Sequence, residues 1–207
     1  MDSDVDDDRP IGVGPHLEPW PVDERLDPEL LANGDTRNVI DGYRYWTREA
    51  IVADLDTRRH TFHVAIENWQ HDFNIGTVVR NANAFLAHTV HIVGKRRWNR
   101  RGAMVTDRYQ HVEHHESIAA FLSFATEAGL ELIGTDIIDG SKPLEGSALP
   151  ANAVLVFGQE GPGLSPEMIE ACSDVFEITQ FGSTRSINVG VASGIAMHAW
   201  IQQHPPY

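Results

Sequence analysis

This chain of 207 residues has little cysteine, no long apolar run and no signal-like beginning. Its single cysteine, Cys172, excludes an internal disulfide bond and a metal site built from several thiolates. A membrane-spanning helix needs roughly 20 consecutive apolar residues, and the sequence contains no such run. The chain begins with MDSDVDDD, which is acidic, whereas a signal peptide begins basic and becomes apolar. We therefore expect a cytoplasmic protein with no membrane partner.

Basic residues are also scarce. The chain has 16 Lys and Arg against 30 Asp and Glu, and its formal net charge at pH 7 is −14. This balance argues against a large nonspecific nucleic-acid surface. One short segment is nevertheless strongly basic, because it contains Lys95, Arg96, Arg97, Arg100, Arg101 and Arg108. A concentrated basic segment in an acidic protein can still hold phosphates locally.

The pattern of apolar residues divides the chain into three regions. Residues 1–15 are rich in Asp, Gly and Pro without apolar periodicity, which predicts a disordered acidic tail. Residues 16–60 contain several prolines and predict an irregular extension with helices near 28–32 and 48–58. Residues 61–207 alternate between strand-like segments (63–69, 89–94, 130–136, 153–158, 175–179) and helix-like segments (75–86, 117–128, 165–171, 188–202). This alternation predicts an α/β fold with a mostly parallel sheet flanked by helices.

Three short segments stand where an expected strand meets an expected helix, the place where open α/β sheets gather ligands. The first, NIGTVVR, runs from Asn74, which suits a helix N-cap, to Arg80, which lies in the middle of a helix with an apolar stripe. The second, FGQEGPGLS, carries Glu160 among glycines but fits neither common nucleotide-phosphate motif. The third, SINVGVA at 186–192, opens a last helix rich in small residues that permit close backbone packing.

In their order and spacing, these segments resemble the signature motifs of the SpoU family, the RNA 2′-O-ribose methyltransferases of the SPOUT class. The resemblance covers about residues 61–203 and implies a deep C-terminal trefoil knot, S-adenosylmethionine as methyl donor, an RNA substrate and a homodimer. It assigns catalytic roles to the motif side chains of Asn74, Arg80, Glu160, Ser186 and Asn188. It also implies that the donor is held at Thr135, Gly158, Ile178 and Ile187, chiefly through backbone groups.

The family's arginine is held to help deprotonate the ribose 2′-hydroxyl. A guanidinium has a pKa of roughly 12.5 or more, so Arg80 stays charged at pH 7. We therefore expect Arg80 to bind the acceptor phosphate and to stabilise the developing alkoxide, while phosphate or water shares the removal of the proton.

The basic segment KRRWNRRG, at 95–102, interleaves one aromatic residue with several cations. It is either a solvated charge run or an RNA clamp, in which Trp98 stacks on an unpaired base and arginines bind phosphates. We favour the clamp, formed by Arg96, Arg97, Trp98, Arg100 and Arg101. The methyl transfer requires no metal, and we expect none. The only crowding of ligand-type residues is in an expected loop and consists of His111, His114, His115 and Glu116.

Two other functions remain open. A knotted methyltransferase can act on a base nitrogen instead, although Arg80 within the N-x5-R pattern is typical of the ribose-modifying branch. A non-catalytic RNA-binding protein can use the same scaffold, although it would have less reason to keep all five motif side chains. The sequence does not distinguish tRNA from rRNA or indicate the modified nucleotide, and the resemblance leaves the first 60 residues without a role.

Overall fold

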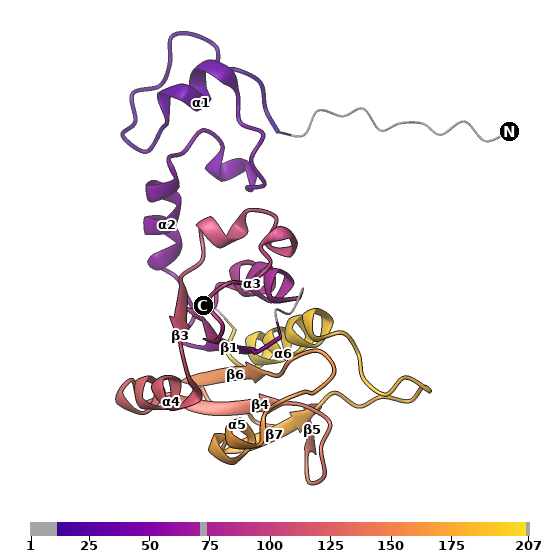
Figure 1. Cartoon of the computed structure of the whole chain (residues 1–207). Coiled ribbons are helices and arrows are strands. Elements are labelled where there is room, and N and C mark those ends of the chain that lie inside the picture. The colour runs from indigo at the N-terminus through magenta and orange to yellow at the C-terminus, as the bar shows by residue number, and fades with distance from the viewer. Residues whose placement is uncertain (1–11, 71–73, 206–207) are drawn as a thin grey trace, which may run out of the picture. The chain divides into compact units, whose positions relative to one another are not determined.

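The computed structural model describes residues 12–70 and 74–205. The chain forms two compact units, Met1–Asp56 and Thr57–Tyr207 (Figure 1). Most of the expected acidic tail, residues 1–11, lies outside the described residues. Within the described residues, 12–70 and 74–205, no helix is both long enough and apolar enough to cross a membrane.

The first unit is built from short helices and irregular segments. Its elements are α1 (Pro28–Asn33), the 3₁₀ helix η1 (Asp41–Tyr43) and α2 (Arg48–Asp56). Asp27 caps α1 by accepting a hydrogen bond from the Glu29 amide. The fully buried Asp35 accepts bonds from the Arg37 side chain and the Tyr45 amide, and these bonds lower its pKa to about 2 against the opposing effect of burial.

The second unit is an α/β domain with seven strands in the order β3-β2-β1-β6-β4-β7-β5, in which every pairing between described residues is parallel. The strands are β1 (His63–Asn68), β2 (Val90–Gly94), β3 (Val112–His115), β4 (Glu131–Thr135), β5 (Lys142–Pro143), β6 (Ala153–Phe157) and β7 (Asp174–Glu177). The helices are α3 (Ile75–Ala84), α4 (Ile118–Glu127), α5 (Pro166–Ala171), α6 (Val189–Gln203) and the 3₁₀ turns η2 (Arg101–Ala103) and η3 (Thr106–Arg108). The predicted fold class is confirmed.

Helices cover both faces of this sheet (Figure 1). On one face, α3 and α6 pack over apolar side chains such as Val64 and Ile66 of β1. On the other face, α4 and α5 pack over Ala65 of the same strand. Both faces of β1 are therefore buried, as is usual for a central strand of a parallel sheet, and this explains the apolar residues Val64, Ala65 and Ile66 at its centre.

Two strands depart from the sequence-based expectation. No strand was expected between the segments 89–94 and 117–128, but β3 occupies Val112–His115 and pairs with β2 at the sheet edge. This strand is only partly buried and mostly polar, so its apolar signal is weak. The short β5, Lys142–Pro143, was not predicted for the same reason, because both of its residues are exposed. The histidines of β3 therefore belong to a strand and not to a loop.

Candidate active site

Side chains from all three motifs meet at one point of the second unit. Asn74 Nδ2 donates a hydrogen bond to the Glu160 carboxylate. Asn188 Nδ2 donates to Asn74 Oδ1 at 2.9 Å and lies 3.5 Å from the second Glu160 oxygen. Glu160 and Asn188 follow Asn74 by 86 and 114 positions, so the fold alone creates this amide–carboxylate cluster.

The two asparagines occupy helix N-cap positions but use their side chains differently. Asn74 precedes α3 with helical backbone angles, and its side chain makes no capping bond. Asn188 caps α6, because its Oδ1 accepts from the Gly190 amide at 2.9 Å while its Nδ2 points to the cluster. The structural interpretation of Asn74 as a capping side chain is therefore wrong, whereas Asn188 combines a cap with a contact to the other motifs.

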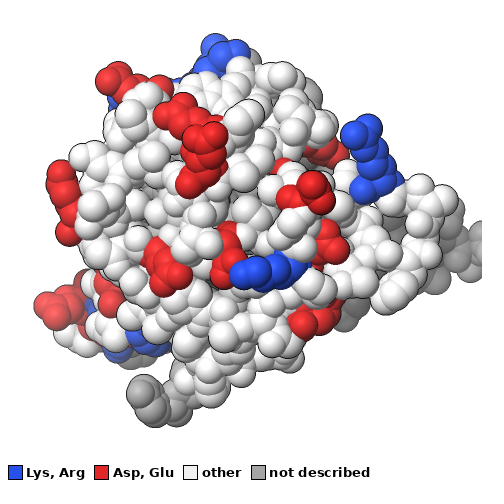
Figure 2. Space-filling model, turned by 90° about the horizontal axis from the view of Figure 1, so that it is seen from below, with Lys and Arg blue, Asp and Glu red and all other residues white. Residues whose placement is uncertain are grey.

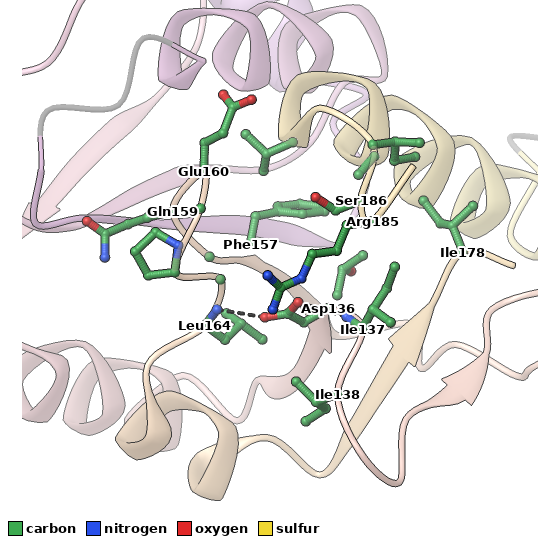
Figure 3. A pocket seen from close by; sticks show the side chains of 18 of the residues that line it. Asp136, Ile137, Ile138, Phe157, Gln159, Glu160, Leu164, Ile178, Arg185 and Ser186 are labelled. Carbon is green, nitrogen blue, oxygen red and sulfur yellow. Dashed lines mark hydrogen bonds between the residues drawn. The ribbon is translucent and has the colours of Figure 1, made fainter. Parts of the chain in front are cut away.

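A cavity of about 450 Å³ opens beside this cluster, at the carboxyl ends of β4, β6 and β7 (Figure 3). Ligands of open α/β sheets bind at this edge. The cavity is lined by six of the residues expected in the site: Thr135, Gly158, Glu160, Ile178, Ser186 and Ile187. All four positions expected to hold the donor thus face one space, and Glu160 joins the cavity to the amide–carboxylate cluster.

The loop after β6 folds back tightly on itself. Gln159 and Gly163 exchange backbone hydrogen bonds of 3.1 and 3.0 Å. A Cβ placed on Gly158 would lie 2.0 Å from the Gly163 carbonyl carbon and 2.2 Å from the Leu164 amide nitrogen. Only glycine fits here, because both neighbouring atoms are backbone and cannot move aside. The glycines of the second motif therefore shape the wall of the cavity.

Two further charged residues, Asp136 and Arg185, line the cavity and were not identified from the sequence. Asp136 accepts hydrogen bonds from the Leu164 and Ile137 amides, both at 2.7 Å, and so ties the end of β4 to the loop after β6. Arg185 reaches from the segment before α6 toward Asp136 across the cavity (Figure 3). Their positions next to Thr135 and Ser186 are the only signal that sequence reasoning had available.

Arg80 does not line this cavity. It lies on α3, about 9 Å along the helix from Asn74 at 1.5 Å per residue. Its side chain is exposed, and the structure records no hydrogen bond or ion pair for it within residues 12–70 and 74–205. The described part of one chain therefore brings four of the five expected catalytic residues to the cavity or its cluster and leaves Arg80 apart.

The segment between β2 and β3 carries the expected RNA-binding residues. Its arginines are exposed at Arg96, Arg97, Arg100 and Arg101. The buried Asn68 holds the start of the segment by donating to the Lys95 and Arg97 carbonyls at 2.6 and 3.0 Å. The segment also lies against α3, because a Cβ on Gly76 would be 2.7 Å from the Ala103 amide nitrogen.

Trp98 differs from its expected environment. It is half-buried and packs against the core beneath α3 and α6, while the Arg100 guanidinium lies 5.2 Å from its ring centroid. The segment is therefore not wholly solvent-facing.

Acidic side chains are common on the face of the molecule that Figure 2 shows from below, where Lys and Arg are few.

The second notable cluster of polar side chains lies on the α4 face of the sheet. His63 Nδ1 is 2.8 Å from His91 Nε2, and His91 Nδ1 is 2.9 Å from His115 Nε2. Burial, together with a smaller effect of the neighbouring imidazoles, lowers the pKa of His63 to about 4 and that of His91 to about 2. These rings are therefore neutral at pH 7, and each offers one N–H and one lone pair.

The chain therefore has an α/β domain with a cavity at the carboxyl edge of a parallel sheet. The SpoU rRNA Methylase family matches residues 61–198, and the chain belongs to this family. The resemblance proposed from the three motifs is confirmed. The trefoil knot stays a prediction.

Curated relatives and solved structures agree with this assignment. An uncharacterized tRNA/rRNA methyltransferase of Mycolicibacterium vanbaalenii is 32% identical over 179 residues, which cover 81% of this chain and 56% of that protein. One of Mycolicibacterium smegmatis is 32% identical over 141 residues, covering 65% and 44%. The chain thus spans about half the length of these relatives.

Among solved structures, an A. aeolicus TrmH/SpoU tRNA modifying enzyme superposes with a TM-score of 0.67 at 22% identity, covering 76% of this chain and 82% of that one. An AdoMet-bound rRNA methyltransferase from Sinorhizobium meliloti gives 0.65 at 22% identity, covering 75% and 61%. At this identity the likeness establishes a shared fold.

Proposed function

We propose that this chain transfers the methyl group of S-adenosylmethionine to a ribose 2′-hydroxyl of tRNA or rRNA. The observation that carries the proposal is the convergence of Asn74, Glu160 and Asn188 beside the cavity. A structural role does not require three polar side chains from three separate motifs to meet at the solvent-accessible edge of a cavity. An activity on tRNA or rRNA also fits a cytoplasmic location.

The cavity suits the methyl donor in size and lining. Its volume of about 450 Å³ falls within the roughly 300–1,000 Å³ of small-molecule sites. Backbone groups around Gly158, Ile178 and Ile187 provide donors and acceptors for the adenosine part, and Thr135 closes the wall at β4. S-adenosylmethionine supplies an activated methyl group on its sulfonium. The side chains of this chain then have to orient the acceptor oxygen and stabilise its developing charge.

Each motif side chain can be given a part in that task. The Glu160 carboxylate, held by both asparagine amides, orients the acceptor side of the cavity, and Ser186 contributes a hydroxyl at its rim. The charged guanidinium of Arg80 binds an acceptor phosphate and stabilises the alkoxide that forms.

Arg80 is absent from the lining of the cavity, and this favours a homodimer, because a second copy can complete a site that one chain leaves open. Val191 and Ile195 support this proposal, since both are exposed apolar side chains one turn apart on α6. A monomeric mass by light scattering at micromolar concentration would contradict it.

The exposed arginines of the 95–102 segment suit binding to RNA phosphates. Replacement of Arg96, Arg97, Arg100 and Arg101 by Ala is expected to weaken RNA binding. It should also flatten the salt dependence, by roughly 0.7–0.9 in log–log slope for each lost phosphate contact. The measurement is RNA affinity across a salt series. An unchanged slope would leave this segment as a charged surface without a part in recognition.

The decisive experiment is methyl transfer from labelled S-adenosylmethionine to total tRNA and rRNA from cells that lack this gene. Nuclease digestion and mass spectrometry then identify the modified nucleoside. A 2′-O-methylated nucleoside, absent with Arg80→Ala, is the expected product. A methylated base would instead support the base-nitrogen activity, and failure to bind the donor by calorimetry would support a non-catalytic RNA-binding protein.

A further inference from the structure

Three potential metal ligands lie together on β2 and β3, outside the site described above. They are His91, Glu113 and His115, and one ligand atom from each lies within 4.8 Å of the others. The register of the two parallel strands explains this, because His91 lies directly opposite Glu113, and His115 follows on the same face two residues later.

The separations between these atoms suit a small tetrahedral cation. Zinc binds imidazole nitrogen and carboxylate oxygen at roughly 2.0–2.2 Å, which places neighbouring ligand atoms about 3.4 Å apart in a tetrahedron. His91 Nδ1 lies 2.9 Å from His115 Nε2 and 3.9 Å from Glu113 Oε2. The observed distances lie on either side of the required one, so small side-chain rotations suffice.

The surroundings support the same ligand set. His91 is fully buried, and its Nε2 lies 2.8 Å from His63 Nδ1. An N–H on His91 Nε2 donated to His63 leaves the His91 Nδ1 lone pair aimed at the other two ligands. A metal-binding histidine usually donates its second ring nitrogen in this way, which fixes its tautomer and orientation.

Aromatic rings cover one side of this cluster, and Glu113 is exposed on another. The rings of Phe121 and Phe124 pack around His91 and His115, with ring centroids 4.8–5.6 Å apart, and they exclude water from that side. The Glu113 side chain is 51% exposed, so a cation can enter from solvent and keep a water in its fourth position.

From this geometry we propose that His91, Glu113 and His115 form a binding site for a divalent cation of the zinc type. The proposal departs from the expectation that the protein binds no metal. This ligand set also differs from the crowding of ligand-type residues in the sequence, His111, His114, His115 and Glu116, because the two share only His115. His114 Nε2 is already 2.7 Å from the Gly94 carbonyl and belongs to the other side of the strand.

The location suggests a structural role. β2 and β3 are the two strands from which the basic segment emerges, and β3 is an edge strand held by one neighbour. A cation shared between them would fasten the base of that segment. The donor cavity is lined by other residues, so the metal takes no part in the methyl transfer proposed above.

The test uses the full chain, stripped of metal with a chelator and titrated with Zn²⁺ or Co²⁺ by calorimetry. We expect one cation per chain, a Co²⁺ absorption spectrum typical of tetrahedral coordination, a higher melting temperature and slower amide exchange in residues 95–115. Mg²⁺, which prefers an all-oxygen octahedral shell, should bind much more weakly.

Variants identify the ligands. His115→Ala and Glu113→Gln act at partly exposed positions, so both proteins should fold. We expect each to lower Zn²⁺ affinity by more than the roughly 10–100-fold that loss of an outer-shell partner costs. The matched controls are Glu116→Gln and His198→Ala, an exposed carboxylate and an exposed imidazole outside the site, and both should bind as the parent protein does. No binding, or equal binding in all four variants, would overturn the proposal.

Discussion

Asn188 offers a direct way to separate a structural role from a functional one, because its two side-chain atoms have different partners. Oδ1 accepts from the Gly190 amide and caps α6, whereas Nδ2 donates to Asn74 and approaches Glu160. Serine also caps helices well but has no amide to donate. Asn188→Ser should therefore keep the cap and lose the cluster contact, while Asn188→Ala loses both.

The two variants should differ in stability and agree in activity. Loss of an N-cap costs about 1 kcal/mol, so Asn188→Ala should unfold at lower urea than Asn188→Ser. A hydrogen bond that involves a charged partner contributes roughly 1.5–3 kcal/mol, and the exposure of this cluster favours the lower end. Both variants should then lose about tenfold in the rate of methyl transfer, since about 1.4 kcal/mol corresponds to a factor of ten.

The assays are urea unfolding and initial rates of methyl transfer at saturating donor, with both variants fully folded at the assay temperature. Glu160→Ala, alone and combined with Asn188→Ser, provides the control, because residues that act as one cluster show non-additive losses. The reasoning fails if Asn188→Ser and Asn188→Ala, both fully folded, are as active as the parent. Asn188 would then be a helix cap and nothing more.

Three further predictions concern Arg80, Trp98 and the buried pair His63 and His91. Arg80→Ala should lower the rate of methyl transfer by roughly a hundred- to thousandfold while calorimetry shows nearly unchanged donor affinity, because Arg80 lies outside the cavity. Trp98→Ala should weaken RNA binding by about 1–3 kcal/mol with little change in salt slope, and should also lower the urea midpoint, because the ring packs on the core. With a chelator present, the free energy of unfolding should have its full value above pH 6.5 and should fall as the pH drops toward 4. The unfolded chain binds protons at both histidines in this range, whereas the lowered pKa values of His63 and His91 disfavour protonation in the folded protein. The free energy of unfolding should therefore fall by up to about 1.4 kcal/mol per pH unit for each group. A flat profile from pH 7.5 to 4.5 would contradict this.

The central strands and the helix starts were predictable because local residue types and burial agree. β6 is buried on both faces and is a continuous apolar run, and β1 is equally buried with Val64, Ala65 and Ile66 at its centre. Ser117 and Ser165, the first residues of two expected helices, cap α4 and α5, the second with proline in the first helical turn. In these elements the local preference and the tertiary environment favour the same structure.

β3 was missed because its stability comes from a neighbour and not from its own residues. Only Val112 in it is apolar, and its histidines and Glu113 would suit a solvated loop equally well. The strand forms because β2 offers an unpaired edge, and because His115 finds a partner in His91 between two phenylalanine rings. Such contacts join positions far apart in the chain, which periodicity within one segment cannot detect.

The same limit applies to Asn74, where the sequence indicated two interpretations and energetics decides between them. As a cap its side chain would gain about 1 kcal/mol, whereas a hydrogen bond to a carboxylate gains roughly 1.5–3 kcal/mol. The second is available only because the loop after β6 brings Glu160 to the start of α3. α3 begins without a capping bond from the Asn74 side chain, and the Asn74 amide donates to Glu160 of the second motif. A polar side chain that gives up a local bond for a distant one in this way is evidence for a site that the isolated helix would not need.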